Sequence, residues 1–268
     1  MQLDAYLARI GYTGALRPDL ATLRALHRAH LLAIPYENLD IHLGRRMTLD
    51  LPQIFAKLVG ARRGGWCYEM NGLFAWALRQ IGFRVQLLSG TVGRASEGDT
   101  VEGNHLVLLV DLEQLYLADV GFGNGFLEPL PLVAGCYHQG FLTYELATDD
   151  TRWHFLNHAH GGPGFAMRLT PYRLTDFAAA CHVLQTAPTS GFVRMTVCHR
   201  FTPTGIVSLR GAVLTEVRAE GVARHTITDA ATYAAVLRAQ FALDIPQVAA
   251  LWEDTWSRHL AWHDAQAV

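Results

Sequence analysis

The sequence contains few charged residues, which make up 17% of its 268 positions against about 25% in ordinary soluble domains. Its 22 Lys+Arg and 24 Asp+Glu residues nearly cancel, so the formal net charge is −2. Nucleic-acid-binding proteins rely on Lys and Arg contacts to phosphate. The lack of a basic excess therefore argues against a nucleic-acid partner, and a hydrophobic content of 50% argues against disorder.

Long apolar runs are also absent, and none approaches the roughly 20 residues that span a bilayer. The amino terminus lacks the basic start, apolar stretch and small-residue cleavage site of a secretory signal. We therefore expect a soluble, cytoplasmic protein without a membrane partner.

Cysteine occurs only four times, at positions far apart and without a CxxC pair. This spacing indicates neither a zinc ribbon nor a disulfide framework, which leaves room for a reactive thiol. The four residues are Cys67, Cys136, Cys181 and Cys198.

Three histidines, His154, His158 and His160, lie close together without an accompanying set of Cys or carboxylate ligands. On a strand, His154 and His158 would stand about 13 Å apart at roughly 3.3 Å per residue, too far to share one ion. We predict that no metal is bound, and that this segment is a solvated strand followed by a turn.

Helical spacing of apolar residues dominates the first third, and a β-branched texture with Gly, Asp and Asn turns begins after Gly82. Helices are predicted over residues 20–34, 51–58, 67–81, 230–241 and 246–256. Strands are predicted over residues 84–88, 105–110, 115–118, 142–147, 153–156, 192–198, 206–209, 213–217 and 222–227. The order predicts an α+β protein with domains at 1–83, 84–190 and 191–268.

Cys67 stands where a turn containing Gly64 and Gly65 passes into an apolar helix. The free N–H groups and the positive dipole end at a helix start favour a thiolate over a thiol. The glycines leave room for a substrate to approach the sulfur. This is a setting for a nucleophile, although an isolated free cysteine is more often a small buried hydrophobic residue.

His105 and Asp119 supply the other groups that such a nucleophile needs. His105 begins an apolar strand, from which an imidazole can take the thiol proton, and Asp119 ends another strand. A carboxylate there can accept the second ring N–H and stabilise the imidazolium. Taken singly, a core histidine and a turn-forming aspartate remain equally good explanations.

Several separated segments together resemble the arylamine N-acetyltransferase family. They are residues 35–40 (PYENLD), 63–69 (RGGWCYE), 71–74 (NGLF), the strand led by His105, and residues 119–123 (DVGFG). The resemblance continues to about Pro188. It implies that Cys67 is the acetylated nucleophile, His105 its base and Asp119 the third member. It also implies a papain-like fold with an N-terminal helical bundle, a central β-barrel and a C-terminal α/β lid.

The same resemblance implies that Glu37 and Arg63 pair beneath the loop that leads to Cys67. We expect a bidentate Arg–carboxylate bond there, which supports the site. Aromatic residues near the nucleophile are candidates for an apolar acceptor pocket: Trp66, Tyr68, Phe122 and Phe126.

The implied activity is transfer of an acetyl group from acetyl-CoA to arylamines, hydrazines or N-hydroxyarylamines. It would proceed by a ping-pong mechanism through acetyl-Cys67, without a metal, in a monomer or homodimer, as in xenobiotic metabolism. Two alternatives stay open at this point. One is an amide synthase that uses a larger acyl donor, and the other is a thioesterase or cysteine hydrolase in which water replaces the amine.

Overall fold

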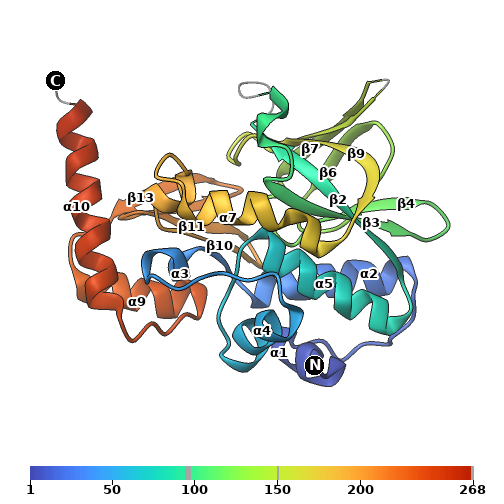
Figure 1. Cartoon of the computed structure of the whole chain (residues 1–268), viewed down its shortest axis with the longest axis horizontal. Helices are drawn as coiled ribbons and strands as arrows, with labels where there is room; N and C mark the ends of the chain where they lie inside the picture. Colours follow the sequence, from blue (N-terminus) through green and yellow to red (C-terminus); the bar gives the residue numbers. More distant parts are fainter. Residues whose placement is uncertain (94–97, 150, 267–268) are drawn as a thin grey trace.

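The computed structural model describes residues 1–93, 98–149 and 151–266. It contains one eight-stranded and one five-stranded antiparallel sheet, with helices packed around both (Figure 1). This arrangement confirms the predicted α+β class. None of the described helices is long and apolar enough to cross a membrane.

The amino-terminal part is helical, as predicted. Its helices are α1 Leu3–Ile10, α2 Leu20–Ala33, α3 Leu39–His42, α4 Leu51–Phe55 and α5 Cys67–Ile81. Helix α2 starts at Asp19, whose side chain accepts the Thr22 N–H at 2.8 Å. The helix predicted over 51–58 is α-helical only to Phe55 and then widens into a π-turn over Ala56–Gly60. Helix α1 was not predicted.

The eight-stranded sheet curls into a nearly closed barrel. One of its strands begins at His105, and another ends directly before Asp119. The strand order of this sheet is β5 Leu130–Pro131, β4 Leu115–Ala118, β3 His105–Asp111, β2 Arg84–Val92, β9 Phe165–Tyr172, β8 Trp153–Leu156, β7 Leu142–Thr148 and β6 Gly135–Gln139. The sequence analysis missed β5, β6 and β9. Half of β9 is exposed on both faces, so its sequence lacks the alternation that identifies a strand.

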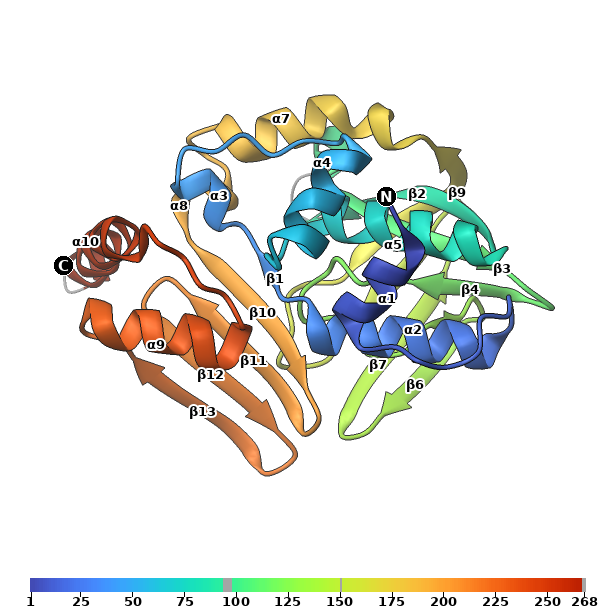
Figure 2. The ribbon, with the colours of Figure 1, turned by 90° about the horizontal axis from the view of Figure 1, so that it is seen from below.

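The five-stranded sheet joins the two ends of the chain. Its strands are β1 Tyr36–Glu37, β10 Val197–Thr202, β11 Gly205–Arg210, β12 Val213–Arg218 and β13 Gly221–Thr226, in that order. Helices α9 (Ala230–Phe241) and α10 (Val248–Gln266) follow, and α9 lies on a face of this sheet (Figure 2). Helix α7 (Ala178–Thr186) precedes β10 in the chain and was not predicted.

The strand predicted over residues 192–198 is wrong for most of its length. Ser190 accepts the Phe192 N–H at 3.2 Å and starts a short helix, α8 (Gly191–Arg194). Strand β10 begins only at Val197, where pairing with Arg210 of β11 becomes available. Local capping therefore overrides the β-branched composition in this segment.

Helix α5 packs against β2 and β3 of the barrel. One buried apolar cluster contains residues of the helices and of the barrel, and a second joins the five-stranded sheet to α9 and α10. The predicted limits at 83/84 and 190/191 stay a prediction. For the site, the essential result is that the start of α5 faces the barrel strand that follows His105.

Candidate active site

Cys67 is the first residue of α5, and its side chain is buried. A Cβ added at Gly121 would lie 2.7 Å from the Cys67 Cα, so only glycine lets this loop approach the helix start so closely. Burial raises the pKa of the Cys67 thiol, while the nearby backbone of Leu106 and Tyr68 opposes the rise. Burial therefore opposes the thiolate that the helix start favours, and a nearby proton acceptor would offset this effect.

His105 and Asp119 form a buried pair in which the ring Nε2 lies 2.7 Å from the Asp119 Oδ2. A Cβ at Gly90 would lie 3.0 Å from the His105 ring, so the absence of a side chain there accommodates the imidazole. The backbone of Leu106, the residue after His105, lies close enough to the Cys67 thiol to influence its pKa. The structure thus brings the sequence-predicted Cys67, His105 and Asp119, called the candidate triad below, to one place.

Asn71 is a polar residue of this centre that the sequence analysis did not single out as a site residue. Its Nδ2 donates to the Asp119 Oδ1 at 2.8 Å and to the Leu106 carbonyl at 2.6 Å. Its Oδ1 accepts the Val120 N–H at 2.9 Å. The available signal was its position four residues after Cys67, which places both side chains on one face of α5.

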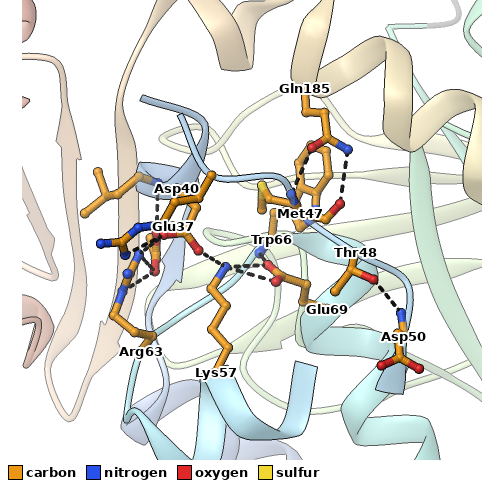
Figure 3. Close-up of polar contacts among 12 residues, drawn as sticks. Glu37, Asp40, Met47, Thr48, Asp50, Lys57, Arg63, Trp66, Glu69 and Gln185 are labelled. Atoms are coloured by element: carbon orange, nitrogen blue, oxygen red, sulfur yellow. Dashed lines mark hydrogen bonds and ion pairs between the residues drawn. The ribbon is translucent and has the colours of Figure 1, made fainter. Parts of the chain in front are cut away.

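Beneath the loop leading to Cys67 lies a buried group of ionised side chains, called the charge network below (Figure 3). Its members are Glu37, Asp40, Lys57, Arg63 and Glu69. Arg63 pairs with Glu37, but its Nε and Nη2 both contact the same oxygen, Oε1, at 3.0 and 2.7 Å. The expected two-oxygen fork is wrong because the Glu37 Oε2 accepts the Leu39 N–H at 2.8 Å instead.

Lys57 occupies the middle of the network and is the single lysine of the sequence. Its Nζ lies 2.9 Å from the Asp40 Oδ2 and 2.9 Å from the Glu69 Oε1. Burial lowers the pKa of Lys57, but attraction from Glu69, Glu37 and Asp40 outweighs it and leaves that pKa above its usual value. Glu69 in turn accepts the Trp66 N–H at 3.2 Å, so Lys57 is connected to the residue before Cys67.

The candidate pocket aromatics differ in exposure. Trp66, Tyr68 and Phe126 are buried in the core, and the Tyr68 hydroxyl donates to the Gly103 carbonyl at 2.6 Å. Phe122 is partly exposed and meets the His105 ring edge to face, with centroids 5.2 Å apart. Phe165, which the sequence analysis did not single out, lies 5.1 Å from the same ring. Phe122 is therefore the candidate in the best position to meet a substrate at His105.

The histidine segment is only partly the solvated strand and turn that was predicted. His158 is buried, and its Nε2 lies 3.0 Å from the Asn124 carbonyl oxygen. His154 instead pairs with Asp149 at the surface. Within the described parts of the chain, no group of three or more His, Cys, Asp or Glu residues has the arrangement of a metal site.

A surface hollow of about 610 Å³ lies at the other end of α5, between Gly82 and Asp111. Its lining does not include any member of the candidate triad. The hollow is therefore separate from the candidate triad at the start of α5.

A cysteine at a helix start, next to a barrel strand that begins with a histidine whose ring contacts an aspartate after the neighbouring strand, is the arrangement typical of papain-like folds. Residues 19–250 match the family model described as N-acetyltransferase. The chain is 34% identical over 250 residues to the arylamine N-acetyltransferase of Escherichia coli (strain K12), covering 91% of this chain and 89% of that protein. It is also 34% identical over 245 residues to the Gallus gallus pineal gland isozyme NAT-3, covering 81% and 84%. The chain belongs to the arylamine N-acetyltransferase family.

Solved structures agree with this assignment. The Mycobacterium marinum arylamine N-acetyltransferase superposes with a TM-score of 0.87 at 31% identity, covering 95% of this chain and 98% of that one. The same M. marinum protein in complex with CoA superposes equally well, with the same TM-score of 0.87. The predicted papain-like fold is confirmed by these structures.

Proposed function

We propose that this protein transfers the acetyl group of acetyl-CoA to the amino group of an arylamine through an acetylated Cys67. The observation that carries the proposal is the buried His105–Asp119 pair beside the sulfur of a cysteine at a helix start. Membership of the arylamine N-acetyltransferase family supports the same reaction. Cys67 is the nucleophile, His105 the proton acceptor and Asp119 the group that orients His105.

In the first half-reaction, His105 takes the Cys67 proton and the thiolate attacks the thioester carbonyl of acetyl-CoA. With Nε2 held by Asp119, the nitrogen that exchanges the proton is Nδ1. Backbone N–H groups at the start of α5 stabilise the tetrahedral oxyanion. The bond between the acetyl carbon and the coenzyme A sulfur then breaks, and the coenzyme A thiolate receives the proton from the imidazolium.

In the second half-reaction, the amine nitrogen attacks the acetyl carbon of acetyl-Cys67 and gives its proton to His105. The carbon–sulfur bond to Cys67 breaks, which releases the acetylated amine, and the imidazolium of His105 gives its proton to the Cys67 thiolate to restore the thiol. Phe122 lies against His105 and offers an apolar ring face to an aromatic acceptor. Hydrazines and N-hydroxyarylamines present the same kind of nucleophilic nitrogen, and we include them as acceptors.

Few Lys and Arg residues are available to contact the phosphates of coenzyme A. We therefore expect backbone N–H groups and apolar contacts to contribute much of its binding. We further expect the protein to act in the cytoplasm, as a monomer or homodimer.

Intact mass after incubation with acetyl-CoA tests the proposal. We expect one acetyl adduct that persists in Cys136→Ser, Cys181→Ser and Cys198→Ser and is lost in Cys67→Ser. The absence of an adduct on the wild type, together with no turnover of any arylamine, would contradict it. Rapid and sustained release of coenzyme A without an amine would favour the hydrolase instead.

A further inference from the structure

His27 is a fully buried residue of α2 that touches the chain segment between Asp119 and Leu127 at both ends. The backbone N–H of Asp119 donates to its Nε2 at 3.0 Å. Its Nδ1 lies 2.9 Å from the carbonyl oxygen of Leu127. Because a backbone N–H only donates and a carbonyl only accepts, the Nε2 must be bare and the Nδ1 must carry the hydrogen.

This arrangement requires an uncharged ring. Burial lowers the pKa of His27 from its ordinary value of 6.5 to about 4, so the ring is neutral at physiological pH. A protonated ring would direct a second N–H at the Asp119 N–H, which would lose its acceptor. His27 is therefore suited to holding the segment but not to exchanging protons during turnover.

Ring contacts add to the two hydrogen bonds. The His27 ring stacks on Phe126, with centroids 5.7 Å apart and planes 10° from parallel. Phe74 of α5 meets the same ring edge to face at 5.7 Å. Helix α2, helix α5 and the 119–127 segment thus meet at His27.

The held segment carries two groups that reach the candidate triad. Gly121 lies against the Cys67 backbone, and its N–H donates to the Asp119 Oδ1 at 2.8 Å. Phe122 lies against the His105 ring. A displacement of either end of the segment would move the aspartate behind His105 or the aromatic ring beside it.

We propose that His27 is a positioning residue for acetyl transfer, a neutral clamp that fixes the 119–127 segment and through it Asp119 and Phe122. The inference rests on the proposed function of Cys67. It assigns His27 no contact with substrate or with the reacting atoms.

Two substitutions separate the two hydrogen bonds. The amide nitrogen of Asn stands as many bonds from Cα as the histidine Nδ1, so His27→Asn keeps a donor for Leu127 and removes the acceptor for Asp119. The amide oxygen of Gln matches Nε2 in the same way, so His27→Gln keeps the acceptor for Asp119 and removes the donor for Leu127. His30→Gln is the matched control, because His30 is equally buried on α2 and lies 2.9 Å from the Tyr6 hydroxyl rather than near the segment.

The measurements are the pH dependence of Cys67 alkylation by iodoacetamide, in a Cys136→Ser, Cys181→Ser, Cys198→Ser background, and the steady-state constants for acetyl-CoA and an arylamine. For His27→Asn we expect the alkylation midpoint to rise by about one pH unit and kcat/KM for acetyl-CoA to fall about 10- to 100-fold. For His27→Gln we expect a midpoint close to that of the wild type and a KM for the arylamine raised several-fold. His30→Gln should lower stability without moving the midpoint.

The proposal is overturned if both His27 variants keep the wild-type midpoint and lose activity only in proportion to their folded fraction, as His30→Gln should. If His27→Asn does not fold, the test rests on His27→Gln. A folded His27→Gln whose KM for the arylamine equals that of the wild type is enough to reject the proposal. Alkylation does not require acetyl-CoA, so a wild type that is alkylated but never acetylated would refute the proposed function separately.

Discussion

The candidate triad and the charge network are two buried polar clusters that both adjoin the start of α5, and they hold their side chains differently. In the charge network, partners are redundant: Asp40 contacts Lys57, Arg63 and Arg45, and Lys57 contacts two carboxylates. In the triad, the bonds form a line from Asn71 through Asp119 to His105. This line of bonds ends at His105, near the Cys67 sulfur, so only its His105 end is available for the reaction.

This difference in bonding indicates which cluster contributes to folding and which to the reaction. Removing one member of a buried redundant network strands an opposite charge, so the loss falls on folding. Replacing Cys67, or replacing Asp119 by a neutral amide, strands no buried charge, so the loss falls on the reaction. The predictions below are ordered from the largest expected effect to the smallest, and each one tests this separation.

Cys67→Ser should reduce acetyl transfer by about 10⁴-fold or more, because a serine hydroxyl is a far weaker nucleophile in a site built for a thiolate. The free energy of unfolding should change by no more than about 1 kcal/mol, since the substitution is nearly isosteric. Arylamine acetylation and urea unfolding measure the two effects. A large loss of stability would show that the two clusters are not separable at this residue.

Asp119→Asn should lower kcat/KM by about 10³-fold, because a neutral amide neither stabilises the imidazolium nor selects the correct His105 tautomer. The loss should be visible at all acceptor concentrations, while circular dichroism stays that of a folded protein. If the variant retains more than a tenth of the wild-type rate, Asp119 does not have this role in orienting and stabilising His105.

Arg63→Ala should destabilise the protein by about 3–5 kcal/mol, because Glu37 is left buried without its cation. Folded yield and activity should fall together. Arg45→Ala is the control, because half-exposed Arg45 lies outside the charge network and contacts Asp40 at 3.4 Å, so that its loss should cost no more than about 1 kcal/mol. A fully stable but inactive Arg63→Ala would count against a structural role.

Acidification should destabilise the protein through histidines that are buried in the neutral form. Burial lowers the pKa of His27 to about 4 and that of His199 to about 3, from the ordinary 6.5. Between these values the unfolded chain binds more protons, so stability is complete above pH 6.5 and falls as pH decreases below it. We expect a loss of about 2 kcal/mol per histidine between pH 7.5 and pH 5.

Urea unfolding at a series of pH values checks this acid effect. His27→Gln should remove the His27 contribution, so that the slope of unfolding free energy against pH between pH 6.5 and 5 decreases by about 1 kcal/mol per pH unit. An unchanged slope would mean that other groups than His27 cause the loss of stability in acid.

Phe122→Leu should have the smallest effect, because it removes only an aromatic face beside His105. We expect the KM for the arylamine to rise about fivefold, corresponding to about 1 kcal/mol of aromatic contact. Acetylation of Cys67 in the absence of an amine should keep its rate. An equal slowing of both half-reactions would instead assign Phe122 to support of the triad.

Residues with a strong local pattern were predictable. Cys67 stands out because glycines precede a helix, and His105 and Asp119 because each adjoins an apolar strand. The resemblance was still needed to connect them, since each alone has an ordinary structural explanation. By contrast, Lys57 and His27 lie in segments with an apolar helical pattern. Nothing in the neighbouring sequence indicates that Lys57 contacts carboxylates or that His27 accepts a distant backbone N–H.

The sequence by itself determined most of the helices and strands, the α+β class and the candidate triad, because helical and strand periodicity, capping and turn chemistry act between residues close in the chain. Only the tertiary structure decided which polar groups face one another. The His27–Asp119 bond joins residues 92 positions apart, and the Arg63–Glu37 pair joins residues 26 positions apart. Such contacts depend on how whole elements pack, and burial then decides the charge that each group carries.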